Sequence, residues 1–127
     1  MIHTRILKAL SLCSIATLFV FTNTIAQTEV SMIFVGDVMQ HDGQIEAARN
    51  SANDTYEYED GFKFVKPILN QYDLRVANLE VTLAGAPYKG YPQFSAPDEL
   101  SETLVNSGFN VILTANNHSC DRGSKGV

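Results

Sequence analysis

The fold is decided by residues 109–123, FNVILTANNHSCDRG. This stretch opens with apolar and β-branched residues, which favour a strand. It continues with two amides, an imidazole, a hydroxyl, a thiol and a carboxylate, and gathering such groups costs free energy unless they find partners. We therefore expect a strand whose end carries a reactive or binding group, with its partners supplied by earlier parts of the chain.

Two earlier segments also consist of an apolar run that ends in polar residues. Residues 30–39, VSMIFVGDVM, are almost continuously apolar up to a Gly-Asp pair that interrupts the run and places a carboxylate at Asp37. Such a run is typical of a strand buried on both faces in a parallel sheet. Residues 73–80, DLRVANLE, predict another strand, in which Asn78 and Glu80 share one face because strand side chains alternate.

Helical patterns lie between these strands. Helices are expected at residues 41–50, 62–70 and 97–107, and irregular loops at 51–61 and 81–97. Pro67 lies inside the second helical pattern, so that helix is either kinked or short. The alternation of strands and helices predicts an α/β fold with a parallel sheet.

The N-terminal segment has the pattern of an export signal. Residues 1–26 contain Arg5 and Lys8, an apolar run and a small-residue cleavage site at Ala26. The alternative is an uncleaved membrane anchor, although the apolar run is shorter than the ~20 residues that span a bilayer. The expected location is therefore the periplasm, the cell surface or the medium, with contact to a membrane only through an uncleaved signal segment.

The charge of the chain is acidic. It has 127 residues with 9 Lys and Arg against 14 Asp and Glu, a net charge of −5. Loss of Arg5 and Lys8 with the signal would make it more negative, which argues against nucleic-acid binding and favours cations. Cys120 would then be the sole cysteine, so no intramolecular disulfide is expected.

Polar side chains follow all three predicted strands. They are Asp37, then Asn78 and Glu80, then Asn116, Asn117 and His118. The carboxyl ends of parallel strands meet at one edge of a sheet, where ligands collect. Carboxylates, amides and an imidazole together suit a divalent cation, and a positioned histidine can transfer a proton.

Four motifs in order resemble a known family. They are GDVM at residues 36–39, NLE at 78–80, FSAP at 94–97 and ANNH at 115–118, followed by Asp121 and Gly123. The stretch from residue 30 to 127 looks like the N-terminal part of the CapA family of poly-γ-glutamate capsule biosynthesis proteins. That family is similar to the calcineurin-like metallophosphoesterases, so the resemblance implies the first βαβ part of a layered α/β/β/α fold. The expected organisation is a signal peptide at 1–26 and a truncated domain at 27–127.

The resemblance also implies roles for single residues. Asp37, Glu80 and Asn117 match ligands of two divalent ions, which would be Mn, Mg, Fe or Zn, and His118 matches the catalytic imidazole. Supporting or substrate-facing positions are His41, Asn78, Asn116 and Asp121. Metallophosphoesterases usually have a histidine where this chain has Met39, and whether His41 replaces it stays open.

The function that the resemblance implies is exported polymer metabolism. A full-length protein would be a metal-dependent hydrolase or transferase acting on capsule, poly-γ-glutamate or another cell-envelope polymer. Its partners would be an anionic polymer, a phosphoester or a peptide, and other capsule-synthesis proteins. The alternative is a non-catalytic assembly or polymer-binding protein with the same fold. The 127 residues alone are expected to be an inactive fragment.

Overall fold

The computed structural model describes residues 28–127, and the expected signal peptide lies outside this range. Its centre is a parallel sheet of three strands, β1 (Met32–Val38), β4 (Leu74–Leu79) and β5 (Val111–Leu113), in the order β1-β4-β5. The mixed α/β architecture with a parallel sheet is thus confirmed. It is consistent with part of a metallophosphoesterase-like fold.

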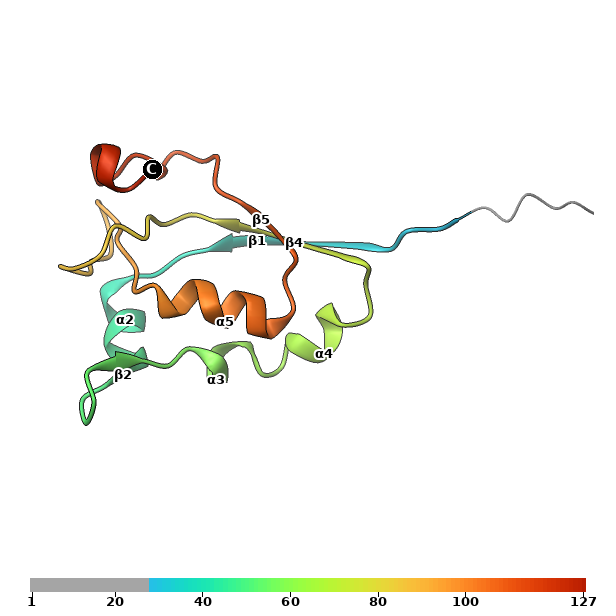
Figure 1. The fold of residues 1–127 in the computed structure, drawn as a ribbon, viewed down its shortest axis with the longest axis horizontal. Coiled ribbons are helices and arrows are strands. Elements are labelled where there is room, and N and C mark those ends of the chain that lie inside the picture. Colours follow the sequence, from blue (N-terminus) through green and yellow to red (C-terminus); the bar gives the residue numbers. More distant parts are fainter. Residues whose placement is uncertain (1–27) are drawn as a thin grey trace, which may run out of the picture.

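The helices gather on one side of this sheet (Figure 1). They are α2 (Asp42–Ala48), α3 (Glu59–Phe62), α4 (Lys66–Leu69) and α5 (Glu99–Ser107). A short 3-10 helix near the end of the chain, η1 (Gly123–Lys125), is not among them. Among the described residues, none of the helices is long and apolar enough to cross a membrane.

The predicted helix at residues 62–70 is divided into two short ones. α3 ends at Phe62 and α4 begins at Lys66, with a turn between them. Pro67 occupies the first turn of α4, where its missing N–H removes no helical hydrogen bond. Of the two possibilities at Pro67, the structure shows a short helix.

The predicted helix at residues 41–50 ends early, at Ala48, and the predicted loop at 51–61 contains some regular structure. β2 (Arg49–Asn50) pairs antiparallel with β3 (Thr55–Tyr56), and α3 begins at Glu59. Asp54 has a positive φ of 57° and closes the turn between the two strands. The sequence hides this hairpin because its two strands are too short for a visible alternation.

The third helix ends as predicted. Gly108 follows α5 with a φ of 107°, a left-handed conformation that favours glycine. A Cβ at this position would also lie 2.9 Å from Oδ1 of Asn70, so both the backbone and the space select glycine.

The core lies between the sheet and the helices. Its largest fully buried apolar side chains are Phe94, Leu69, Leu100 and Leu104, and they pack near Ala77 and Leu79 of β4. The expectation that the first strand is buried on both faces is wrong in the described structure. Exposure alternates along β1, and Phe34 is 68% exposed, because the described helices cover only one face of the sheet.

Candidate functional site

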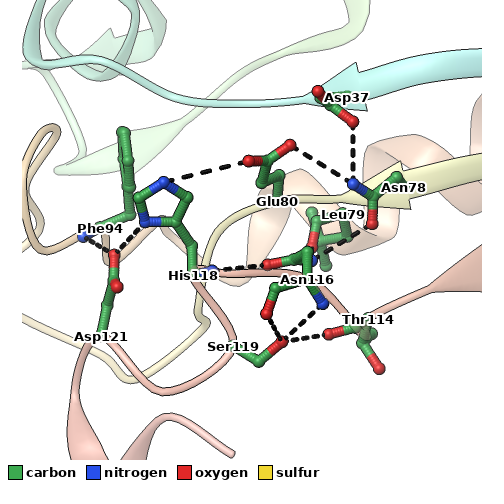
Figure 2. Close-up of polar contacts among 10 residues, drawn as sticks. All are labelled: Asp37, Asn78, Leu79, Glu80, Phe94, Thr114, Asn116, His118, Ser119 and Asp121. Carbon is green, nitrogen blue, oxygen red and sulfur yellow. Dashed lines mark hydrogen bonds and ion pairs between the residues drawn. The ribbon is translucent and has the colours of Figure 1, made fainter.

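The register of the sheet brings the predicted polar residues together. Asp37 pairs with Asn78 across β1 and β4, and Asn78 pairs with Leu113 of β5. The segment after β5 then turns back towards these strand ends, carrying Asn116 and His118 (Figure 2). The strand around Asp37 shifts register after Phe34, so β1 continues through the Gly-Asp pair as an irregularity and ends at Val38.

The Asn78 amide connects two carboxylates. Its Nδ2 donates to Oδ1 of Asp37 at 2.8 Å and to Oε2 of Glu80 at 3.4 Å. The Asn78 hydrogen bond and a contact with Glu80 lower the pKa of Asp37. Hydrogen bonding to Asp37, burial and the charge of Asp37 raise the pKa of Glu80. The two carboxyls therefore resist being ionised together, as expected for like charges that share a site.

His118 lies between this pair and another carboxylate. Its Nδ1 is 2.8 Å from Oδ2 of Asp121, and its Nε2 is 3.9 Å from Oε1 of Glu80. The same Asp121 oxygen accepts a hydrogen bond from the backbone N–H of Phe94 at 2.9 Å. Asp121 therefore favours the tautomer with hydrogen on Nδ1 and directs Nε2 towards Glu80 (Figure 2).

Asn116 ties the third strand end to the second. Its Nδ2 donates to Oδ1 of Asn78 at 3.2 Å and to the carbonyl of Leu79 at 2.9 Å. Its Oδ1 accepts the backbone N–H of His118 at 2.9 Å. Asn116 thus positions the imidazole relative to the Asn78 amide.

Two contributors were not assigned as site residues from the sequence. The Ser119 hydroxyl accepts the backbone N–H of Asn116 at 3.0 Å and donates to the carbonyl of Thr114, which closes the turn after β5. A serine three residues after an asparagine is a visible turn signal. Phe94 belongs to a motif visible in the sequence, but only the structure reveals that its backbone holds Asp121.

Two predicted residues take no part in this hydrogen-bond network through their side chains. The Asn117 side chain is exposed and makes no hydrogen bond within the described residues. His41 precedes α2, where its backbone N–H donates to Gln44 at 2.8 Å. The Phe94 ring contacts both imidazoles edge to face, since its centroid is 5.3 Å from that of His41 and 4.7 Å from that of His118.

The donor chemistry suits a hard divalent cation only in part. Asp37 and Glu80 present neighbouring carboxyl oxygens at one sheet edge, and oxygens of this kind are the ligands that such a cation prefers. In residues 28–127, however, no three side chains of His, Cys, Asp or Glu are grouped so that they could hold a metal. Asp37 and Glu80 could therefore supply only part of the ligands that a metal ion needs.

Comparison with known proteins places this arrangement in a family. No curated protein matches the chain. The model of a family described as bacterial capsule synthesis protein PGA_cap matches residues 31–127. This range includes all three strands of the parallel sheet and every residue of the network described above. The match confirms the resemblance to the CapA capsule proteins, and the chain belongs to the PGA_cap family of bacterial capsule synthesis proteins.

Proposed function

We propose that this chain forms part of an exported, metal-dependent hydrolase or transferase that acts on capsule, poly-γ-glutamate or another cell-envelope polymer. The observation that carries the proposal is the convergence of Asp37, Glu80 and His118 from three separate strand ends. The family match supports the link to capsule synthesis. The basic and apolar pattern of residues 1–26 supports export.

In this proposal Asp37, Glu80 and Asn117 hold divalent ions. When bound, such ions polarise a phosphoryl or carbonyl oxygen and supply a nucleophile at neutral pH. Water, substrate or other protein groups would complete the coordination, because the described residues offer two neighbouring carboxylates. Asn117 is exposed, which leaves its amide oxygen available as a ligand.

His118 is the proposed proton donor to the leaving group. The contact between its Nδ1 and Asp121 holds the ring in one orientation. Its Nε2 then faces the strand-end carboxylates, where a substrate would lie. Asp121 and Asn116 act as positioning residues, since they contact the histidine and not the expected reacting atoms.

A second candidate is a non-catalytic assembly or polymer-binding protein. The observation that favours it is that, within the described residues, no three His, Cys, Asp or Glu side chains are grouped so that they could hold a metal ion. Such a protein would keep the sheet edge and the family fold without turnover.

The two candidates are separated by Mn²⁺ titration of the chain, followed by electron paramagnetic resonance. We expect Glu80→Gln to weaken Mn²⁺ binding by roughly tenfold or more, because it removes a charged oxygen ligand. Asp73→Asn is the matched control, since Asp73 lies at the opposite end of the same strand. Equal affinity of the wild type and Glu80→Gln would overturn the metal assignment and favour the non-catalytic candidate.

A further inference from the structure

Three positively charged residues belong to the long loop after β4 and to the segment that contacts it. Nη1 of Arg122 donates to the carbonyl of Pro87 at 3.2 Å, and Nζ of Lys125 lies 4.0 Å from the position that a Cβ on Gly85 would take. Lys89 is an exposed residue of the same loop. We call Lys89, Arg122 and Lys125 the basic cluster. Figure 1 shows this loop and η1 at the carboxyl end of the parallel sheet.

The cations of the basic cluster have no carboxylate partner. Within residues 28–127, none of the three forms an ion pair with an Asp or Glu, whereas Arg49 pairs with Asp54 and Lys63 pairs with Asp60. The chain as a whole is acidic, with 9 Lys and Arg against 14 Asp and Glu. The basic cluster is therefore a local exception to the charge of the chain, and its donors are available to an external anion.

The basic cluster adjoins the candidate site through two neighbouring residues. Oδ2 of Asp121 contacts Nδ1 of His118 at 2.8 Å, and the next residue in the chain is Arg122. The loop is joined to the site as well, because the N–H of Phe94 donates to Asp121 at 2.9 Å. The same two segments thus hold the imidazole and the cations, so a substrate long enough to span them can contact both.

Acidic side chains meet the same loop at other residues. Ala86 and Tyr88 border a hollow with mostly acidic walls, whereas Arg122 and Lys125 lie against Pro87 and Gly85. The charged residues of that hollow are Asp42, Glu46, Arg49, Asp54 and Glu99. An anion at this loop would therefore be repelled from the hollow and attracted to the basic cluster.

We infer that the basic cluster binds the oxyanion groups of a linear anionic substrate, beside His118. Arginine presents a planar fork of donors that fits a carboxylate or a phosphate, and lysine adds a mobile positive charge. Anions repeated along a chain can contact several cations at once, and each contact raises the effective concentration for the next. The inference rests on the proposed function, because it assigns residues to part of the substrate of that site.

The probes are a six-unit glutamate oligomer, a linear hexaphosphate and a six-unit glutamine oligomer, which is the neutral counterpart of the first. Binding to the 127-residue chain is followed by shifts of backbone amide resonances, in the presence of a chelator. We expect an anionic oligomer to bind with a Kd on the order of 1 mM, and more weakly as the salt concentration rises. A preference between the two anionic oligomers identifies the anion as a carboxylate or a phosphate.

The neutral oligomer should bind at least several times more weakly than the preferred anionic one. Equal binding of the glutamine oligomer, or no binding of either anionic oligomer, would overturn the inference. Binding to phosphatidylglycerol vesicles without binding to either oligomer would also overturn it, because the partner would then be a membrane surface.

Arg122→Gln and Lys125→Gln each remove one positive charge. We expect each to weaken binding of the preferred oligomer about threefold to fivefold, the value of one ion pair near a surface. The Lys125 side chain makes no hydrogen bond within the described residues, so Lys125→Gln tests the charge without disturbing the fold. Lys66→Gln is the matched control, because this exposed lysine of α4 lies far from η1 (Figure 1).

Unchanged affinity in both Arg122→Gln and Lys125→Gln would contradict the inference. An equal loss in Lys66→Gln would contradict it too, since the oligomer would then respond only to the net charge of the chain.

Mn²⁺ titration of separate samples without the chelator distinguishes this inference from the proposed function. Oligomer binding without Mn²⁺ binding would support the basic cluster and remove the metal site. Mn²⁺ binding without oligomer binding would remove the basic cluster as a binding surface and leave the metal site.

Discussion

The two ends of the parallel sheet carry polar residues of the same kinds in different arrangements. At the amino ends, Ser31, Asp73 and Asn110 each directly precede a strand. The Asp73 carboxylate accepts the backbone N–H of Ser31 at 2.8 Å and its hydroxyl at 2.7 Å. Asn110 donates to the carbonyl of Asp73 at 2.8 Å and accepts the N–H of Arg75 at 2.9 Å. These side chains bond mainly to backbone groups and hold neighbouring strands in register.

At the carboxyl ends, side chains mostly contact other side chains. The Asn78 amide donates hydrogen bonds to the carboxyls of both Asp37 and Glu80, and Nε2 of His118 faces Glu80. The Ser31 hydrogen bonds lower the pKa of Asp73, whereas the contact with Asp37 raises the pKa of Glu80. One end is therefore arranged for stability. The other holds two neighbouring carboxyls whose pKa values are shifted in opposite directions, which is typical of a binding or catalytic site.

The largest expected loss of stability comes from replacing Phe94, which supports the residues at the carboxyl ends of the strands. Phe94 is fully buried, its ring packs against His118 and its N–H holds Asp121. Phe94→Ala should lower the free energy of unfolding by about 4 kcal/mol, because it leaves a large cavity. Urea denaturation followed by circular dichroism measures this loss.

The control for this change is Phe64→Ala. Phe64 is 78% exposed, so its loss should alter stability by no more than about 0.5 kcal/mol. Similar losses from the two variants would show that Phe94 is not the anchor of the carboxyl end.

The second-largest expected effect is a difference in unfolding free energy between the alanine variants of two asparagines, one before β5 and one after it. Asn110→Ala removes two hydrogen bonds at the amino end and should cost about 2 kcal/mol of unfolding free energy. Asn117→Ala, at the carboxyl end, should change stability by less than about 0.5 kcal/mol, because its exposed side chain makes no hydrogen bond within the described residues.

If Asn117 is a metal ligand, its alanine variant should still lose Mn²⁺ affinity. A stability loss at Asn117 as large as that at Asn110 would remove the distinction between a structural end and a functional end of the sheet.

The smallest expected effect is on the pH dependence of stability, which should change in opposite directions when Asp73 and Glu80 are replaced by their amides. Asp73 has a lowered pKa in the folded protein, so its stabilisation is present above its unfolded pKa and is lost as the pH falls. Glu80 has a raised pKa, so the stabilisation from its neutral form is present at low pH and is lost as the pH rises.

As the pH rises from about 2 to about 7, the stability of Asp73→Asn relative to the wild type should therefore fall. Over the same rise in pH, the stability of Glu80→Gln relative to the wild type should increase. Urea midpoints at several pH values measure both trends. Trends of the same sign would contradict the electrostatic difference between the two ends.

Much of the fold was predictable from local patterns. The strands around residues 32–38, 74–79 and 111–113, and the end of α5 at Gly108, follow from apolar runs and from a residue that permits a left-handed backbone. The division of the helix near Pro67 and the hairpin of β2 and β3 were not predictable in detail. They depend on short segments whose local preferences are weak compared with their tertiary contacts.

The sequence by itself determined which groups end the strands, because alternation within a strand and the position of its last residue place Asp37, Asn78 and Glu80 at one edge of a parallel sheet. Only the tertiary structure decided which groups touch. The contacts of Asn116 with Asn78 and of Phe94 with Asp121 join segments that are 38 and 27 residues apart. Such contacts depend on strand register and on the path of the long loop before α5, and local sequence preferences encode neither.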